Sequence, residues 1–482
     1  MLLVSFYTFG CKLNQLETEA VSDAFCEAGF TVLPWMFSGS LKMPPGAAPI
    51  NNSPPVLCII NTCTVTSRAE QKARRIIRQC LESGCIVLVT GCYAQLEKEA
   101  LKTLEKGSGA LFVFPGQSKE QLLDLPQYLA EKLKNSSGGN LADTSKTKIL
   151  LSRALSSWYP NGKGDTFSFN PKQFLFHSRA FLKIQDGCDG TCAYCRVPLA
   201  RGKSISLNSG EVLRRLKSLE EKGMAEAVIT GVNICQYRDP EYPSRKLPEL
   251  LRFLLDNTSR ICLRLSSLEP EAGLFFEAPG AKAEKTEDFF KVLAHPRIRN
   301  HFHLSVQSGS DSVLAAMGRA YLARDILWVV EKLKTIRDDP FLACDIITGF
   351  PGETEDDFKK TFHLCKTADF AWIHVFPYSK RPGTRAADVK KGLVSERQAG
   401  ERLAVLMELA KQNKSNYVRR WQGKTVEAAA ESFYAVTDNY IKVSILQEKA
   451  GKKPEPGKAF LCKIDRPSKE TEGAFDAWAQ LT

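Results

Sequence analysis

Apolar runs and helical patterns alternate six times between residues 174 and 410, and this alternation limits the fold more than any other feature of the sequence. The runs have the length and the β-branched content of buried strands, and amphipathic helical patterns separate most of them. The six runs are RAFLKIQ, EAVITGV, ICLRLSS, HFHLSVQ, FLACDIITGF and AWIHVFPYS. Strands that alternate with helices usually pair in parallel, so we expect an open or partial (β/α)6 barrel with ligands at the carboxyl ends of its strands.

The regions on either side of this repeat predict two further domains. Residues 1–140 hold three strand-like runs, LLVSFYT, VLCIINT and IVLVT, with helical patterns between and after them, which predicts a parallel α/β sheet. A polar stretch rich in Gly and Ser indicates a linker over 141–173. A helix near 395–418 closes the central domain, and residues 415–482 have the short strands and the size of a small β-barrel. The predicted fold class is therefore α/β with a small β-barrel at the end.

The composition favours a reduced, cytoplasmic protein. Apolar residues make up 43% of the 482 residues, which suffices for packed cores, and the net charge of +12 suits a polyanionic partner such as RNA. The N-terminus lacks the basic start and the cleavage site of a signal peptide, and no apolar run approaches the length of a membrane span. Without secretion, we expect the 15 cysteines to serve metal or redox chemistry rather than disulfides.

Three cysteines follow the first strand of the predicted barrel within the stretch FLKIQDGCDGTCAYCRVPLARG. Cys188, Cys192 and Cys195 form a C-x3-C-x2-C array on a glycine-bearing loop, where three thiolates can face one metal centre. Zinc sites usually take four protein ligands in C-x2-C pairs, and no matching pair follows. Three thiolates can instead hold three irons of a [4Fe-4S] cluster and leave the fourth iron open. The alternative is a chance cluster of cysteines on a polar loop.

Each strand-like run of residues 1–140 ends in a cysteine: Cys11 after YTFG, Cys63 after INT, and Cys92 after VTG. Because carboxyl ends of parallel strands lie along one edge of a sheet, the three thiols could converge there. Taken alone, this pattern leaves convergence and separate packing equally open. Other cysteines are expected in the core, since they fall inside strand or helix patterns; these are Cys26, Cys58, Cys80 and Cys262.

The C-x3-C-x2-C array, with Tyr194 before its last cysteine and a βα barrel around it, resembles the radical S-adenosylmethionine (SAM) enzymes. The resemblance implies a [4Fe-4S] cluster whose open iron binds SAM, and cleavage of SAM to a 5′-deoxyadenosyl radical. It also implies that SAM and substrate contact the later strand ends, although a Gly or Ser there is more often only part of a turn. The residues concerned are Gly231, Asn233, Ser266, Glu269, Gln307, Ser308, Asp345 and Gly349.

Further motifs, TFGCKLNQLETE, NTCTVTSRAEQKARR and TGCYAQ, together with the β-rich tail, make the whole chain similar to the methylthiotransferases. This resemblance implies a second [4Fe-4S] cluster on Cys11, Cys63 and Cys92, which carries a methylated sulfur. One SAM then gives the methyl group and a second gives the radical. The tail would be an RNA-binding TRAM domain, and a flavodoxin or ferredoxin would supply electrons.

Within that family, the wording NQLETE, NTCTVTSRAE and GCYAQ is most similar to the branch that modifies N6-threonylcarbamoyladenosine at position 37 of tRNA. The expected partner is thus the anticodon stem-loop of tRNA, not DNA or a membrane. The alternatives are a methylthiotransferase for isopentenyladenosine-37 or for an aspartate of a ribosomal protein. A more remote alternative is an iron–sulfur protein that binds RNA without catalysis.

Two groups of residues are candidates for RNA contacts. The stretch after Cys63 is rich in cations, and cations in the first turns of a helix are repelled by the positive end of its dipole. An anionic partner would offset this repulsion, so we select Arg68, Lys72, Arg75 and Arg78. The same residues could equally form a solvated helix face. In the tail, Trp421 and Tyr440 could stack on bases, whereas core packing is the more conservative interpretation of each aromatic residue.

Overall fold

A computed structural model describes residues 2–34, 55–105, 109–136, 144–158, 164–270, 284–431, 434–446, 454–468 and 475–482. The chain divides into two compact units. Unit 1 comprises Met1–Phe176 and Arg196–Lys203, and unit 2 comprises His177–Cys195 and Ser204–Thr482. Within the described ranges, no helix has both the length and the apolar character needed to cross a membrane.

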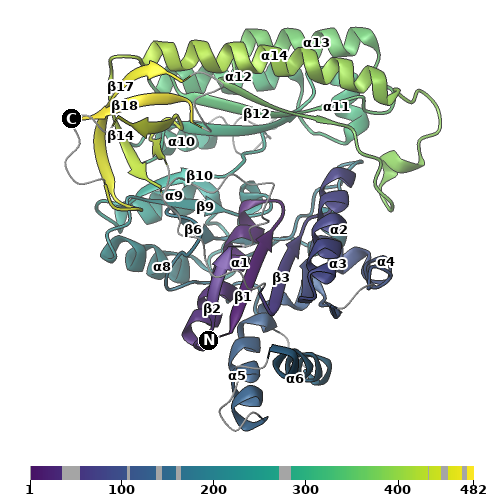
Figure 1. Cartoon of the computed structure of the whole chain (residues 1–482). Coiled ribbons are helices and arrows are strands. Elements are labelled where there is room, and N and C mark those ends of the chain that lie inside the picture. Colours follow the sequence, from purple (N-terminus) through teal and green to yellow (C-terminus); the bar gives the residue numbers. More distant parts are fainter. Residues whose placement is uncertain are drawn as a thin grey trace. The chain divides into compact units, whose positions relative to one another are not determined.

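Unit 1 is built on a parallel five-stranded sheet in the order β2-β1-β3-β4-β5 (Figure 1). The strands are β1 (Leu3–Thr8), β2 (Thr31–Pro34), β3 (Leu57–Thr62), β4 (Ile86–Gly91) and β5 (Leu111–Val113). Every residue of β3 and β4 is buried, as the near-continuous apolar runs of central parallel strands require. The parallel α/β sheet predicted from the sequence is confirmed.

Helices cover the sheet of unit 1 on both faces. They are α1 (Lys12–Glu27), α2 (Ser67–Glu82), α3 (Cys92–Leu96), α4 (Lys98–Lys102), η1 (Gly116–Leu123), α5 (Leu125–Ser136), α6 (Thr144–Ser157) and α7 (Val197–Arg201). One core lies against α1, α5 and α6, and the other lies against α2 and contains Cys58 and Cys80. The core placement predicted for these two cysteines is therefore confirmed, whereas Cys26 and Cys262 are only half-buried.

The stretch 141–173, which the sequence indicated as a linker, contributes to this core. Helix α6 packs beside α5, and its Leu151 and Leu155 are buried together with Phe169 further along the chain. The stretch looks like a linker because it is rich in Ser, Thr and Lys. Three apolar positions at helical spacing are nevertheless enough to pack one face of the helix against the core.

Unit 2 contains the predicted partial barrel, whose strands are parallel and follow chain order within each of two sheets; β6, β9, β10 and β12 are labelled in Figure 1. The strands are β6 (Ala180–Lys183), β9 (Glu226–Thr230), β10 (Cys262–Leu265), β11 (His301–Gln307), β12 (Phe341–Thr348) and β13 (Trp372–Pro377). They form two three-stranded sheets, and isolated parallel bridges join β10 to the start of the second sheet. The helices are α8 (Ser209–Glu221), α9 (Leu247–Asp256), α10 (Glu284–Leu293), α11 (Asp311–Met317), α12 (Ala323–Ile336) and α13 (Glu355–Ala368).

A long helix, α14 (Glu396–Trp421), leads into a closed five-stranded barrel at the C-terminus (Figure 1). Its strands are β14 (Thr425–Ala430), β15 (Ala435–Thr437), β16 (Lys442–Ile445), β17 (Ala459–Pro467) and β18 (Ala477–Leu481). The predicted small β-barrel is confirmed, and it shares a core with α14 and with the start of β12.

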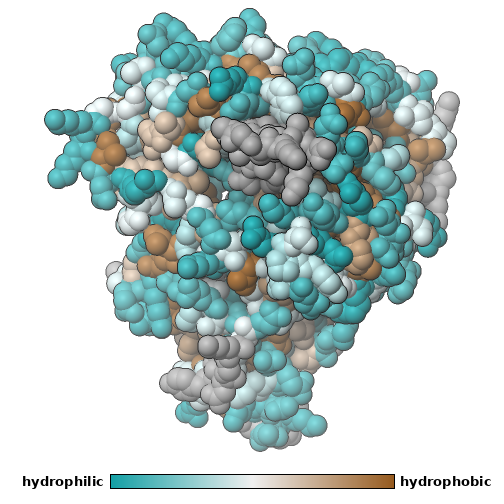
Figure 2. Space-filling model, turned by 180° about the vertical axis from the view of Figure 1, so that it is seen from behind, coloured by the Kyte–Doolittle hydropathy of each residue, from teal (hydrophilic) through white to brown (hydrophobic). Residues whose placement is uncertain are grey.

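Large hydrophobic side chains reach the surface at scattered positions of the described residues. Val65, Leu393 and Leu461 are examples, each more than half exposed and distant from the others in sequence. Figure 2 shows a face on which hydrophobic residues form small groups among hydrophilic ones. Such scattered residues are normal for a folded protein, so those of the described ranges mark no site by themselves.

Candidate functional site

The three cysteines that end the strands of unit 1 lie at neighbouring positions of one sheet edge. Strands β1, β3 and β4 are adjacent and parallel, with Thr8 opposite Asn61 and Asn61 opposite Thr90. Cys11 precedes α1, Cys63 directly follows β3, and Cys92 begins α3. The thiols of Cys11 and Cys92 both act electrostatically on Cys63, as neighbours would.

Two glycines with positive φ allow these loops to approach one another. A Cβ atom at Gly10, where φ is +96°, would lie 2.7 Å from Cβ and 2.8 Å from Sγ of Cys63. A Cβ atom at Gly91, where φ is also +96°, would lie 2.4 Å from the carbonyl oxygen of Thr62. A side chain at Gly10 would therefore displace the thiol of Cys63, and one at Gly91 would displace the backbone just before Cys63.

The environment of Cys63 keeps its thiol protonated until a metal binds. Burial, together with the thiols of Cys11 and Cys92, raises the pKa of Cys63 to about 12, although the Val65 amide and Arg201 oppose this increase. Cys11 is exposed and Cys92 is half-buried, so the set opens to solvent on one side. A thiol with so high a pKa is a poor free nucleophile, and a metal ion would have to displace its proton.

The side chain of Asn14 joins the loops that carry two of these cysteines. Its amide nitrogen donates to the carbonyl oxygens of Phe9, at 2.8 Å, and Thr62, at 3.2 Å. Asn61 in turn donates to the carbonyl oxygen of Asn14 at 3.1 Å. The sequence showed Asn14 only as part of NQLETE, and sequence analysis did not select it as a site residue.

In unit 2, the loop with Cys188, Cys192 and Cys195 follows the short strand β7 (Gln185–Asp186), which pairs with β8 (Ile205–Ser206). A Cβ atom at Gly190 would lie 3.1 Å from Sγ of Cys188 and 3.7 Å from Sγ of Cys192, so this glycine backs both thiols. The amide of Ala193, between the second and third cysteines, donates to Met317 at 2.9 Å. The loop is therefore anchored to the end of α11.

The donor chemistry of each cysteine set fits an iron–sulfur cluster, since each set offers three thiols. Among the residues that the structure describes, no three His, Cys, Asp or Glu side chains are arranged around a single metal ion. The C-x3-C-x2-C array itself offers three thiols, one fewer than the four protein ligands of most zinc sites.

The strand ends nearest the C-x3-C-x2-C loop share a network of hydrogen bonds. The amide nitrogen of Asn233 donates to Glu269 at 2.7 Å, and Arg319 pairs with the same carboxylate. Arg319 also donates to the Tyr194 hydroxyl at 2.6 Å. Burial, together with the carboxylate of Glu269, raises the pKa of Cys192, and Arg319 opposes this. The network links Asn233, Glu269 and Tyr194, as predicted residues, to Arg319, which the sequence did not reveal.

The other predicted strand-end residues have separate surroundings. Gly231 lies close to Gln185, and a Cβ atom there would be 2.8 Å from its Oε1 atom. Asp345 lies 3.0 Å from Nε2 of His303, whose ring stacks on His374 at 5.1 Å, so this group is formed by β11, β12 and β13.

The remaining predicted residues make contacts at their own strand ends. Gln307 is buried at the end of β11 with φ +71°, and Gly349 has φ +76° and donates to Glu353 at 2.7 Å. The amide of Ser266 donates to Ile229, and the hydroxyl of Ser308 lies 3.2 Å from that of Thr361.

The candidate RNA residues separate into two groups. Arg68, Lys72, Arg75 and Arg78 are all exposed on α2, which leaves their charges available to a partner. Trp421 is only 8% exposed and belongs to the core of the C-terminal barrel. Tyr440 packs against the same core and stacks on His301 at 4.1 Å. Core packing was the alternative for both aromatic residues: Trp421 is too buried to stack on bases, and the partly buried ring of Tyr440 already stacks on His301.

Known proteins match nearly the whole chain. The model of the Radical SAM superfamily matches residues 182–365, and that of the uncharacterized protein family UPF0004 matches residues 48–112. The threonylcarbamoyladenosine tRNA methylthiotransferase MtaB of Treponema pallidum (strain Nichols) is 39% identical, over 93% of this chain and 95% of the relative. A tRNA-2-methylthio-N(6)-dimethylallyladenosine synthase of Pelobacter propionicus is 30% identical, over 84% of this chain and 82% of the relative.

Among solved structures, the radical S-adenosylmethionine methyltransferase TsrM of Kitasatospora setae, with cobalamin and a [4Fe-4S] cluster bound, has a TM-score of 0.48 to this chain. Its sequence identity is 15%, and the match covers 80% of this chain and 77% of that one.

Proposed function

The chain belongs to the threonylcarbamoyladenosine tRNA methylthiotransferases of the radical SAM superfamily, and we propose that it adds a methylthio group to C2 of N6-threonylcarbamoyladenosine at position 37 of tRNA. It is a radical SAM enzyme that transfers sulfur, as the motifs predicted, and this family implies a [4Fe-4S] cluster and SAM as cofactors. The observation that carries the proposal is the placement of Cys11, Cys63 and Cys92 at the ends of three neighbouring parallel strands.

We assign the cluster that cleaves SAM to Cys188, Cys192 and Cys195, and a second cluster to Cys11, Cys63 and Cys92. When bound, the two clusters and SAM supply the radical, the methyl group and the sulfur. Burial of Cys63 excludes water from one side of its set, while exposed Cys11 leaves the other side open to substrate. A flavodoxin or ferredoxin is the proposed electron donor.

SAM binding is assigned to the strand ends of the barrel. Asn233 and Glu269 offer an amide and a carboxylate beside the C-x3-C-x2-C loop, and Arg319 fixes the orientation of Glu269 and Tyr194. The residues further round the barrel complete the proposed site for SAM and nucleoside: Gly231, Ser266, Gln307, Asp345 and Gly349. The anticodon stem-loop of tRNA is assigned to the exposed cations of α2, which suit a phosphate backbone.

Mass spectrometry of tRNA nucleosides tests the substrate. A strain that lacks the gene should lose the 2-methylthio form of the threonylcarbamoyl nucleoside, and the gene on a plasmid should restore it. Loss of 2-methylthio-isopentenyladenosine instead, or a mass change in a ribosomal protein with unchanged tRNA, would contradict the proposed substrate.

Cysteine variants in the same strain test the assignment of the second cluster. Cys63→Ala should abolish the methylthio nucleoside, while the purified variant still cleaves SAM, since its C-x3-C-x2-C loop is intact. Cys26→Ser is the matched control, because Cys26 is a half-buried thiol of unit 1 away from the strand ends. Methylthiolation by Cys63→Ala would refute the assignment.

A further inference from the structure

The segment directly after the C-x3-C-x2-C loop belongs to the other unit. Residues Arg196–Lys203 are part of unit 1, although the chain on both sides, up to Cys195 and from Ser204, belongs to unit 2. Within this segment, α7 packs against α3 and η1. The contacts of its two arginines reach the loops of all three strand-end cysteines of unit 1.

Arg201 connects the loops of Cys11 and Cys63. Its side chain is 6% exposed and donates to Oδ1 of Asn14 at 2.8 Å and to Glu17 at 3.0 Å. The amide nitrogen of the same Asn14 side chain donates to the carbonyl oxygens of Phe9 and Thr62, which lie just before the loops of Cys11 and Cys63. Because Arg201 fixes which way the Asn14 amide faces, it also fixes the spacing of these loops.

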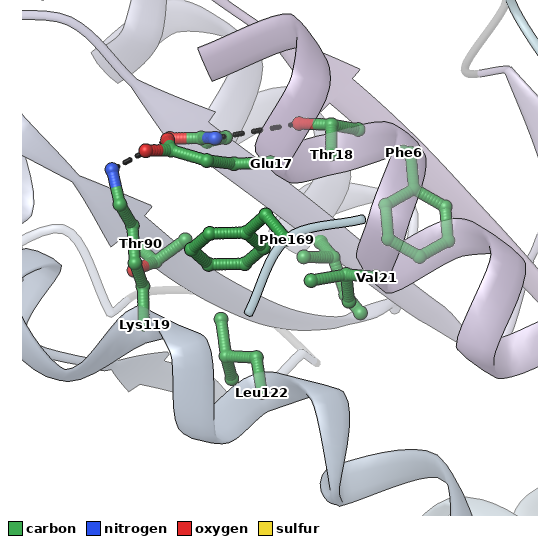
Figure 3. Close-up of a pocket in the computed structure, with 10 residues that line it drawn as sticks. Phe6, Glu17, Thr18, Val21, Thr90, Lys119, Leu122 and Phe169 are labelled. Carbon is green, nitrogen blue, oxygen red and sulfur yellow. Dashed lines mark hydrogen bonds and ion pairs between the residues drawn. The ribbon is translucent and has the colours of Figure 1, made fainter. Parts of the chain in front are cut away.

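Glu17, which lies on α1 like Asn14, pairs with the same guanidinium of Arg201. It is almost fully buried on α1, and its carboxylate also accepts from Lys119 at 2.5 Å. Figure 3 shows Glu17 and Lys119 reaching toward one another from α1 and η1, at the rim of a cavity that Thr90 also lines. One buried carboxylate thus pairs with two buried cations, and removing one member of such a group strongly destabilises the fold.

Arg196 connects the segments after Cys63 and Cys92. Its guanidinium lies 3.4 Å from the Thr64 hydroxyl and 3.6 Å from Glu70, and Thr64 donates to Glu70 at 2.7 Å. It also donates to Glu97 at 2.8 Å, at the end of the helix that Cys92 begins. Thr64 directly follows Cys63, so Arg196 ties that loop to α2 and α3.

We propose that Arg196 and Arg201 are positioning residues that hold the loops of Cys11, Cys63 and Cys92 in the geometry that receives an iron–sulfur cluster. This inference rests on the proposed second cluster. Arg196 follows Cys195 directly, so the last thiol of one cysteine set is adjacent in sequence to the segment that organises the other set. Residues that orient metal ligands in this way typically affect metal affinity or activity by about 10–100-fold.

The test isolates the second cluster in a parent variant of the full chain, Cys188→Ala/Cys192→Ala/Cys195→Ala. After anaerobic reconstitution, this parent should bind about four irons per chain. Adding Arg201→Gln or Arg196→Gln should reduce the iron to less than about two per chain and weaken the EPR signal of the reduced cluster. Arg201→Lys should restore iron only in part, because an ammonium cannot reproduce the fork that reaches Asn14 and Glu17 together. Lys203→Gln removes an exposed charge from the same segment and should leave iron unchanged.

A second background shows whether a loss of iron is specific. In the variant Cys11→Ala/Cys63→Ala/Cys92→Ala, Arg201→Gln should leave SAM cleavage within about two-fold of its parent, since only the other cysteine set is loaded. Equal iron in the first parent with and without Arg201→Gln would overturn the positioning role alone. Loss of both iron and SAM cleavage in the two backgrounds would also overturn it, because that result means general unfolding. A first parent that binds no iron would overturn the proposed second cluster as well.

Discussion

At the scale of single residues, the site of unit 1 depends on glycine as much as on cysteine, because a glycine leaves space that a side chain would fill. Gly10 and Gly29 both have positive φ, +96° and +85°, so an alanine at either position costs about 1–2 kcal/mol of backbone strain. They differ in their surroundings, because a Cβ at Gly10 would overlap Cys63, whereas nothing lies within 4 Å at Gly29. This pair therefore separates strain from steric exclusion.

We expect Gly10→Ala to lower the free energy of unfolding of the metal-free protein by about 1–3 kcal/mol more than Gly29→Ala does. Gly10→Ala should also reduce iron binding at the proposed second cluster, because the thiol of Cys63 must move. Urea unfolding and iron analysis of both variants measure these effects. Equal stability and equal iron content in the two variants would show that the close approach at Gly10 is unimportant.

The residues that the sequence could not reveal are those whose partners are distant. Cys11, Cys63 and Cys92 were selected because each follows an apolar strand, a local signal that repeats three times, and because the resemblance to the methylthiotransferases implies a cluster on them. Arg201 carries no comparable signal, since its partner Glu17 lies 184 residues away. The same holds for Arg319, whose hydroxyl partner Tyr194 lies 125 residues away. An arginine in a polar loop looks like any solvated charge until the fold brings a buried carboxylate or hydroxyl to it.

At the scale of secondary structure elements, one buried carboxylate joins the partial barrel to the C-terminal barrel within unit 2. Glu226, on β9, accepts two bonds of 2.8 Å from Arg264 and one of 3.0 Å from Arg299. Arg264 also donates to the carbonyl oxygens of Thr437 and Asp438, which belong to the C-terminal barrel. Burial would raise the pKa of Glu226, but the arginines around it hold this pKa well below its ordinary value.

Glu226→Gln should therefore lower the free energy of unfolding by about 3–5 kcal/mol near neutral pH, since it leaves buried arginines without their anion. The contribution of a carboxylate with a depressed pKa is complete above its unfolded pKa of about 4.3 and is lost as the pH falls toward its folded pKa. The difference between wild type and Glu226→Gln should thus shrink on acidification from pH 7 to pH 3. Urea unfolding at several pH values measures it, and Glu401→Gln, at an exposed pair with Arg397, is the control. A difference that is independent of pH would contradict the ionised state of Glu226.

Elements were predictable where the hydrophobic period was clean. The six barrel strands and β1, β3 and β4 were predicted from apolar runs, and β4 and β9 show the burial typical of central parallel strands. Strands β2 and β5 were not predicted, because runs of four and three residues are too short to stand out. Helix α6 was missed because Ser, Thr and Lys outnumber the apolar residues that dock it. Trp421 shows the opposite limit, since an aromatic residue near a small barrel looks equally suited to core and surface, and only packing places it inside.

At the scale of the whole molecule, the net charge of +12 favours a polyanion, and the exposed cations of α2 concentrate part of it on one helix face. If these cations contact phosphates of tRNA, each contact releases counterions, and binding weakens as salt concentration rises.

Arg75→Gln/Arg78→Gln should then weaken tRNA binding and lower the slope of log affinity against log salt by about two, or about one per lost contact. Filter binding or fluorescence anisotropy over a range of salt concentrations measures this slope. Lys359→Gln/Lys360→Gln makes the same change in total charge at exposed positions on α13, so it should leave the slope nearly unchanged. Equal slopes for both double variants would show that tRNA responds to the overall charge and not to the face of α2.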